Sequence, residues 1–318
     1  MIAIYGLGPL LGPVIGPVAG GYLVAGRDWR WVFWVLAIVG GFFAMVSFLF
    51  LRETYPTVLL ERKTTRLINE TGNTNLRSKR DTGLTVQQLF IRAIVRPAGL
   101  LVLSPMILIT SIYMGVVYGY QYLMFSTFTY VFQDQYGFPT KSVGLTFLGI
   151  GIGSLLGLLI IGVISDRIVK SRSKPGPGSP SGAMKPEYRL PPLVAGAFFI
   201  PAGLFLYGWS AQYKIHWIIP IIGTGLIGIG NMAVFMCILS YLVDAFTIYA
   251  ASALAANTVI RSIMGALLPL AGQSMYSSLG LGWGNSLLGF IAVACIPVPM
   301  LLMRYGERLR ESLDTNKL

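Results

Sequence analysis

A membrane-spanning helix is indicated near the start of this chain by the stretch Gly8-Pro-Leu-Leu-Gly12-Pro-Val-Ile-Gly16-Pro-Val-Ala-Gly20-Gly21. Its glycines recur every four residues, and no charged residue occurs between Met1 and Arg27. A helix with three prolines is not expected in water, because each proline removes a backbone donor and clashes with the preceding turn. In a bilayer such a helix persists, since neighbouring helices satisfy the freed carbonyls. Residues four apart share a face, so the glycines predict a strip for close helix contact.

The composition of the chain indicates a membrane protein. Of its 318 residues, 54% are hydrophobic and only 11% are charged, and the mean hydropathy is +0.69. Soluble domains carry about 25% charged residues, so lipid is expected to cover the apolar surface. The net charge of +12 comes from basic residues that stand between apolar blocks. That placement is typical of membrane topology and argues against a nucleic-acid partner.

Eight apolar blocks are long enough to cross a bilayer, which takes about 17–25 residues per helix. They predict an all-α polytopic membrane helix bundle, partnered by the lipid bilayer. The expected spans are 3–25, 31–51, 99–124, 142–165, 192–211, 216–242, 249–276 and 284–304.

The distribution of Lys and Arg predicts the orientation. Nine of these residues lie in 52–97, six in 166–191 and four from Arg304 onward. The opposite side carries only Arg27, Arg30, Lys141 and Lys214. The positive-inside rule therefore places both termini and the two long loops in the cytoplasm. We expect little regular structure in 52–97 beyond a short amphipathic helix near 84–94, and a flexible linker over 171–186.

Residues for enzyme chemistry are scarce. The one histidine, His216, stands beside Trp217 at an expected helix edge, and nearly all acidic residues lie in loops. Cys237 and Cys295 lie in apolar blocks, without the spacing of a metal site or a likely disulfide. No secretory signal peptide is expected. The sequence predicts no enzyme, no catalytic residue, no metal and no cofactor.

Arg261 is the one Lys or Arg away from the ends of the expected spans, and Asn257 shares its helix face. A charge at that depth must face protein or water. It is either a structural arginine that satisfies the carbonyls of a broken helix, or part of a substrate or ion pathway. Its expected polar partners are Asn231 and Tyr113. The neighbouring tyrosines Tyr118, Tyr120 and Tyr122 are more typical of a membrane-interface belt.

Gly12-Pro13-Val-Ile-Gly16-Pro17-Val-Ala-Gly20-Gly21 resembles the antiporter signature in helix five of the drug:proton antiporters of the major facilitator superfamily. Asp28-Trp29-Arg30-Trp31 and Glu53-Thr54-Tyr55-Pro56 follow it. That series is similar to helices five and six of the fungal multidrug and polyamine transporter branch. Gly162-Val-Ile-Ser-Asp166-Arg167 resembles the Gly-x-x-x-Asp-Arg element between helices eight and nine.

Further residues extend the resemblance over essentially the whole chain. They are Pro186-Glu187-Tyr188-Arg189-Leu190-Pro191, Tyr241-Leu-Val-Asp244-Ala, Ala253-Leu-Ala-Ala-Asn257 and Arg261-Ser262.

The resemblance implies eight of the usual twelve transmembrane helices, in a chain that begins at the fifth. Residues 1–51 would be the last two helices of the N-terminal half, and 52–97 the cytoplasmic central loop. Residues 98–305 would be the six-helix C-terminal half, and 306–318 a cytoplasmic tail. The lack of helices one to four would reflect a fragment, a mispredicted gene model or a true truncation.

Roles for the motif residues also follow from the resemblance. The glycine strip would close a pore by tight contact, and Asp166 with Arg167 would form charge contacts that break and reform. The alternatives are a generic packing face and an ordinary loop charge pair. The glycines Gly149, Gly153 and Gly157 repeat the four-residue spacing. We predict that they lie against Gly12, Gly16 and Gly20.

Two functions stay open. The first is a secondary active transporter in the plasma membrane, a proton-coupled exporter of drugs, polyamines or other small organic molecules. The second is a non-transporting membrane remnant, sensor or scaffold, which includes an inactive fragment. The candidate pathway residues in the first case are Arg261, Asn257, Asn231 and Tyr113.

Overall fold

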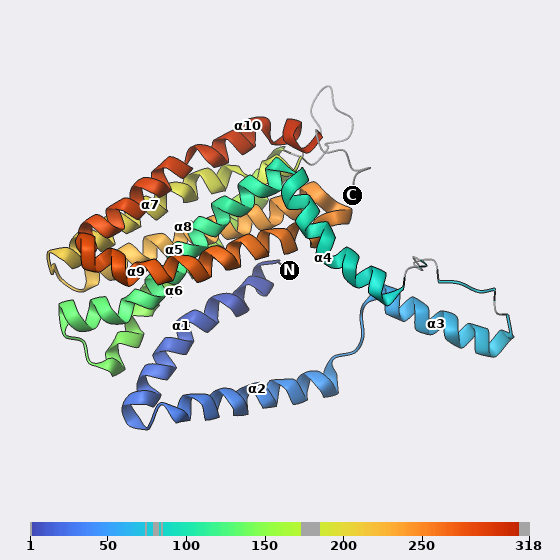
Figure 1. The fold of residues 1–318 in the computed structure, drawn as a ribbon, viewed down its shortest axis with the longest axis horizontal. Coiled ribbons are helices and arrows are strands. Elements are labelled where there is room, and N and C mark those ends of the chain that lie inside the picture. Colours follow the sequence, from blue (N-terminus) through green and yellow to red (C-terminus); the bar gives the residue numbers. More distant parts are fainter. Residues whose placement is uncertain (1, 74, 79–82, 84, 173–184, 312–318) are drawn as a thin grey trace. The chain divides into compact units, whose positions relative to one another are not determined.

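A computed structural model describes residues 2–73, 75–78, 83, 85–172 and 185–311, and every regular element among them is a helix. Figure 1 labels the elements along the chain. The helices are α1 (Ile2–Gly26), α2 (Arg30–Phe50), α3 (Pro56–Thr71), α4 (Val86–Leu103), α5 (Pro105–Tyr136), α6 (Thr140–Arg172), η1 (Pro186–Arg189), α7 (Pro191–Gln212), α8 (Ile218–Phe246), η2 (Thr247–Tyr249), α9 (Ala250–Cys295) and α10 (Pro297–Glu311). Most of the expected linker 171–186 and the end of the expected tail lie outside the described residues.

The chain divides into two compact units. The larger unit, Met1–Arg27 with Arg96–Leu318, is called the bundle below. The smaller unit, Asp28–Val95, holds α2, α3 and the first part of α4. The expected division at residues 51, 97 and 305 stays a prediction.

Helix α3 corrects the expectation that 52–97 has little regular structure. Pro56 stands in its first turn, where a missing backbone N–H costs nothing. Gly72 ends the helix in the left-handed region with φ 68°, and its N–H donates to the carbonyl of Ile68. A proline start and a glycine stop thus delimit 16 residues. The expected short helix near 84–94 is the beginning of α4.

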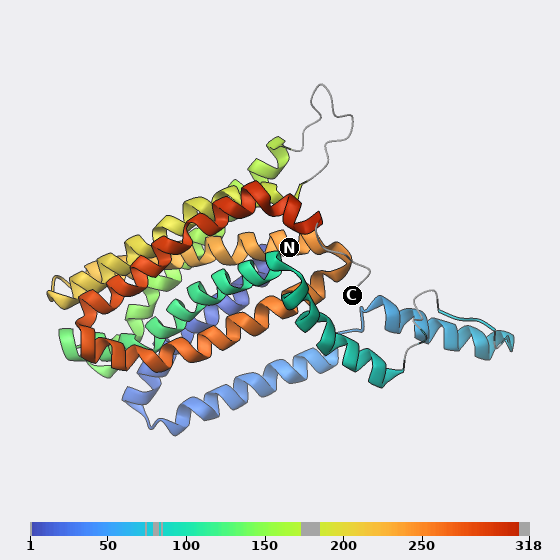
Figure 2. The ribbon, with the colours of Figure 1, turned by 45° about the horizontal axis from the view of Figure 1, so that its top comes forward.

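In the bundle, α5 packs along α9, α8 lies between α6 and α7, and α1 packs on α6. Figure 2 shows the same neighbours after a 45° turn. Large side chains fill the core between these helices, among them Tyr120, Phe128, Phe132, Tyr207 and Tyr241. The α5–α6 and α7–α8 connections lie at one end of the bundle, and η1 lies at the other (Figure 1).

The predicted pairing of the two glycine strips is wrong. A Cβ built on Gly153 would lie 2.0 Å from the carbonyl oxygen of Gly225 in α8. Gly149 and Gly157 likewise face Ile221 and Ile229 of the same helix. These three glycines therefore bring α6 against α8, and not against α1.

Helices α1 and α6 do meet, but through other residues. A Cβ on Gly144 would lie 2.3 Å from the carbonyl oxygen of Pro17, and one on Gly151 would lie 2.5 Å from Val14. Cβ positions on Gly12, Gly16 and Gly20 have no described atom within 4 Å. Helix α6 thus has two close-packed faces, and sequence spacing alone did not assign each face to its neighbour.

Six helical segments of the described chain are long and apolar enough to cross a membrane. The expected count of eight therefore stays a prediction. In α1, only Leu11–Gly26 appears as a shorter apolar helix. The last two expected spans fall into one segment, Ala250–Leu309, which is interrupted at Gly280 with φ 73° and ψ 173°. The N–H groups of Leu281 and Gly282 after this break donate to Oε1 of Gln212, at 2.8 and 3.1 Å.

Candidate functional site

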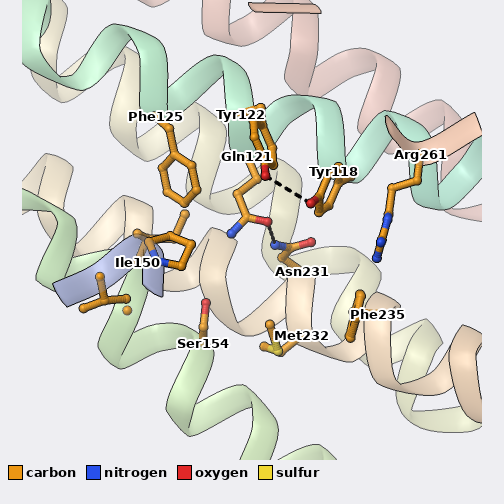
Figure 3. A pocket seen from close by; sticks show the side chains of 13 residues that line it. Tyr118, Gln121, Tyr122, Phe125, Ile150, Ser154, Asn231, Met232, Phe235 and Arg261 are labelled. Carbon is orange, nitrogen blue, oxygen red and sulfur yellow. Dashed lines mark hydrogen bonds between the residues drawn. The ribbon is translucent and has the colours of Figure 1, made fainter. Parts of the chain in front are cut away.

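A cavity of about 370 Å³ opens inside the bundle between α1, α5, α6, α8 and α9. We call it the bundle pocket, and Figure 3 shows the side chains around it. Its lining is mostly apolar and aromatic, with a few polar groups. The lining residues are Pro13, Val14, Tyr118, Gln121, Tyr122, Phe125, Ile150, Gly151, Ser154, Asn231, Met232, Phe235 and Arg261.

Helix α5 supplies the largest share of the aromatic wall. Tyr118, Gln121, Tyr122 and Phe125 are spaced three or four residues apart, so they share one helix face. The Tyr118 hydroxyl donates to the Tyr122 hydroxyl at 3.1 Å, and their ring centroids are 4.8 Å apart. Phe125 extends the wall, with its ring centroid 5.9 Å from that of Tyr122.

An amide pair that includes Gln121 of this wall supplies hydrogen-bonding capacity. Nδ2 of Asn231, from α8, donates to Oε1 of Gln121, from α5 (Figure 3). Asn231 is only 5% exposed. One bond uses one donor and one acceptor, so the amide nitrogen of Gln121 and the carbonyl of Asn231 can serve a ligand.

Arg261 enters the pocket from α9 and lies over two aromatic rings. Its Cζ lies 4.7 Å from the ring centroid of Tyr118 and 5.4 Å from that of Phe235. Gly265, one turn later on the same helix face, makes room for the tyrosine. A Cβ there would lie 3.0 Å from Cδ1 of Tyr118. Gly265 and Arg261 therefore both contact the ring of Tyr118.

The guanidinium of Arg261 is not matched by an acid. Its Nε is buried and has no hydrogen-bond partner among the described residues. No residue that lines the pocket is Asp or Glu. The ring faces attract the positive charge, but they accept nothing in the plane of the guanidinium, where its N–H donors point.

The four pathway residues expected from the sequence separate into two pairs. Arg261 and Asn231 both line the bundle pocket. Asn257 is buried and donates to the Ser111 hydroxyl at 3.4 Å, and Tyr113 is a core residue at 4% exposure. Neither of these two is among the residues that line the pocket.

Sequence reasoning missed Tyr118 and Tyr122, which it assigned to the membrane interface, and it did not select Gln121. A signal was available in the sequence. The α5 residues 118, 121, 122 and 125 repeat at helical spacing and combine rings with one amide on one face. The antiporter-like motif contributes Pro13 to the pocket. Pro17, Gly20 and Gly21 border a smaller cavity of about 230 Å³.

A second polar cluster, called the Arg189 cluster below, joins η1, α6 and α8. Nε of Arg189 lies 2.5 Å from Oδ2 of Asp244, and its guanidinium reaches Oδ1 of Asp166 at 3.8 Å. The Arg189 side chain is 17% exposed and that of Asp244 is 24% exposed, whereas that of Asp166 is 70% exposed. Asp166 thus pairs across the fold with Arg189, which the sequence analysis did not select. Gly162 lies one helical turn before Asp166, and a Cβ built on it would have no described atom within 4 Å.

Within the described part of the chain, no group of three His, Cys, Asp or Glu side chains could hold a metal ion. The thiols of Cys237 and Cys295 are free. The ring of His216 lies beside that of Trp217, with centroids 5.2 Å apart. The groups that the bundle pocket offers are rings, two amides, hydroxyls and one guanidinium.

Comparison with known proteins identifies the family. The model of the Major Facilitator Superfamily matches residues 1–269. The chain is 76% identical to the MFS-type transporter tndD of Aspergillus flavipes, over 99% of this chain and 58% of that protein. It is 56% identical to the MFS-type transporter penM of Penicillium rubens, over 98% and 60% of the two chains.

A third relative, the efflux pump radE of Floropilus chiversii, is 54% identical over 97% of this chain and 57% of its own length. The chain therefore spans somewhat more than half the length of these relatives. Its apolar helices are those of an integral membrane protein. On the family match and these identities, the chain belongs to the major facilitator superfamily.

Proposed function

We propose that this chain forms part of a membrane transporter that moves a small organic molecule through the bundle pocket. The observation that carries the proposal is a cavity of about 370 Å³ inside a bundle of apolar helices, lined by rings and few polar groups. Ligand sites have this size and composition. Relatives named as transporters and as an efflux pump support transport. They do not favour a non-transporting scaffold or remnant, and they do not favour an enzyme.

We infer the finer features from the motifs and the charge pattern. The chain would supply eight helices of a twelve-helix antiporter of the drug:proton branch, in the plasma membrane. Both termini would face the cytoplasm, because Lys and Arg concentrate on that side. Alternating access would rock two halves about a site near the midplane, with protons as the coupled ion.

The Arg189 cluster would act as a cytoplasmic contact during this motion. Arg189 joins Asp166 at the end of α6 to Asp244 at the end of α8, so a shift between these helices would stretch its ion pairs. This proposal keeps Asp166 in the role expected from the sequence. It gives Arg189 the part that had been expected of Arg167.

Transport in proteoliposomes tests the proposal. Two proteins are compared: this chain alone, and this chain joined to the part of tndD that the match leaves out. We expect the extended protein to move labelled 2-naphthoate, 2-naphthamide or spermidine when a pH gradient is imposed, and a protonophore to abolish the movement. If neither protein moves any probe although both bundles are folded, the proposed function is wrong.

A further inference from the structure

The bundle pocket combines aromatic walls with a single positive charge. Four rings line it, those of Tyr118, Tyr122, Phe125 and Phe235, and the charged group among them is the guanidinium of Arg261. None of the lining residues that the structure describes carries a carboxylate. A pocket of this kind attracts flat apolar molecules through its walls and repels cations at its charged end.

The donors of Arg261 are available for a ligand. Nε is buried and unpartnered among the described residues, and the neighbours recorded for the guanidinium are the rings of Tyr118 and Phe235, which offer it no carbonyl or carboxylate acceptor. Elsewhere in the bundle, Arg189 forms ion pairs with the carboxylates of Asp166 and Asp244. A buried N–H group of a charged side chain is costly to leave without an acceptor. An acceptor supplied by a ligand would remove that cost.

We propose that the substrate of this pocket is a planar aromatic or conjugated molecule with an acidic oxygen group, a carboxylate or phenolate, bound by Arg261. The proposal rests on the transport function proposed above. The rings of Tyr118 and Phe235 both lie beside this guanidinium, so the oxyanion and the ring system of the substrate bind as one unit. The Gln121–Asn231 amide pair binds a second, neutral oxygen of the substrate.

The proposal opposes a polyamine or another organic cation as substrate. A polycation would bring like charge to Arg261 and would meet no carboxylate on the pocket wall. The Gln121 and Asn231 side chains offer it neutral carbonyl oxygens, and one of these is already hydrogen-bonded within the pair.

Binding of three matched probes to the purified 318-residue chain in nanodiscs tests the substrate class. The probes are 2-naphthoate, 2-naphthamide and 2-naphthylmethylammonium, which share one ring system and differ in charge. Isothermal titration calorimetry should find naphthoate bound about tenfold tighter than naphthamide, because one charge-assisted contact is worth about that factor. The ammonium probe should bind more weakly than both.

Substitutions test whether the preference for naphthoate depends on Arg261. In R261Q the tenfold preference for naphthoate over naphthamide should disappear, and R261K should retain part of it. R96Q is the matched control, because Arg96 is also half-buried against a ring, that of Tyr249 at 5.4 Å, but lies outside the pocket. Its binding ratios should equal those of the unchanged chain.

A second substitution guards against an R261Q protein that does not fold. Q121E keeps the oxygen that accepts from Asn231 and keeps Arg261, but adds a carboxylate to the pocket. It should weaken naphthoate binding and strengthen binding of the ammonium probe. Tighter binding of the ammonium probe by the unchanged chain would overturn the proposal, as would an unchanged naphthoate preference in Q121E, or no binding of any probe.

Failure of the transport proposal gives a different result. In that case naphthoate binds with the preference described, yet the extended protein does not move it in proteoliposomes. Conversely, transport of spermidine or naphthamide without preference for naphthoate would support the transport function and overturn the substrate class.

Discussion

Two arginines of the bundle, Arg189 and Arg261, are both partly buried and have opposite surroundings. Arg189 is held between the carboxylates of Asp166 and Asp244. Arg261 lies against two rings, and its buried Nε has no described acceptor. A paired cation fixes helices to one another, whereas a cation whose donors are free can take a ligand. On the proposals made above, Arg189 serves as a contact between helices and Arg261 as a binding position in the same bundle.

The largest expected effect comes from the α6–α8 contact, which supports both regions. A Cβ on Gly153 would overlap the carbonyl of Gly225, with backbone and not a flexible side chain in its way. Gly153→Val should therefore lower the free energy of unfolding by about 3 kcal/mol or more, measured by SDS titration of the purified chain. Gly16→Val, at a position with no described atom within 4 Å of a Cβ, is the control and should cost far less. Equal costs would contradict the packing described for α6.

Removal of Arg189 should have the next largest effect. Arg189→Ala leaves the three-quarters-buried carboxylate of Asp244 without its nearest cation. The expected loss is about 2 kcal/mol of unfolding free energy, below that of a fully buried pair because the site is partly solvated. Arg167→Ala removes an exposed arginine next to Asp166 and should change little. Equal stabilities of the two variants would break the contrast between Arg189 and Arg261.

Arg261 should matter more for function than for stability. Arg261→Ala loses two ring contacts and no described hydrogen bond, so the unfolding free energy should fall by only about 1 kcal/mol. Transport by the extended protein should fall more than in Lys214→Ala, which changes a residue between α7 and α8. Both variants are measured at matched expression. Equal tolerance of the two changes would remove Arg261 from the pathway.

The smallest effect is expected at Lys185, whose Nζ lies 2.8 Å from a Glu307 carboxylate oxygen at the surface. This contact raises the pKa of Lys185 above its usual 10.5. Any contribution of this ion pair to the free energy of unfolding is therefore present at neutral pH, and it is lost only as the pH rises above about 10.5. Lys185→Gln should leave the thermal midpoint at pH 7 unchanged, since exposed pairs contribute little. A clear drop would contradict this expectation and show that the Lys185–Glu307 pair stabilises the bundle at neutral pH.

The sequence predicted the all-helical architecture and the inward direction of Arg261, which lines the bundle pocket, because both follow from local composition. A long apolar run predicts a helix wherever it packs, and a charge in the middle of such a run must face inward. The choice of neighbour is not local. Gly149, Gly153 and Gly157 carry the same spacing as the strip in α1, yet they pack on α8.

The pocket wall shows the same limit. Tyr118 and Tyr122 have the composition of interface residues, and only the approach of α9, with Gly265 beside Tyr118, makes their rings part of a cavity. Arg189 stands in a short polar segment of the sequence, and its partners are 23 and 55 positions away along the chain. Contacts of this kind depend on topology, which residue spacing does not encode.

The cap on the broken helix α9 has a consequence for the order of assembly. The N–H groups of Leu281 and Gly282 find their acceptor in Gln212, 69 and 70 residues earlier in the chain. A ribosome that makes about 5–20 residues per second delivers the acceptor several seconds before its donors. Until α9 is complete, the amide of Gln212 stands at the end of α7 without these partners. Closure of this end of the bundle is therefore a late event of biosynthesis, and a Gln212→Ala chain should remain sensitive to proteases longer after synthesis.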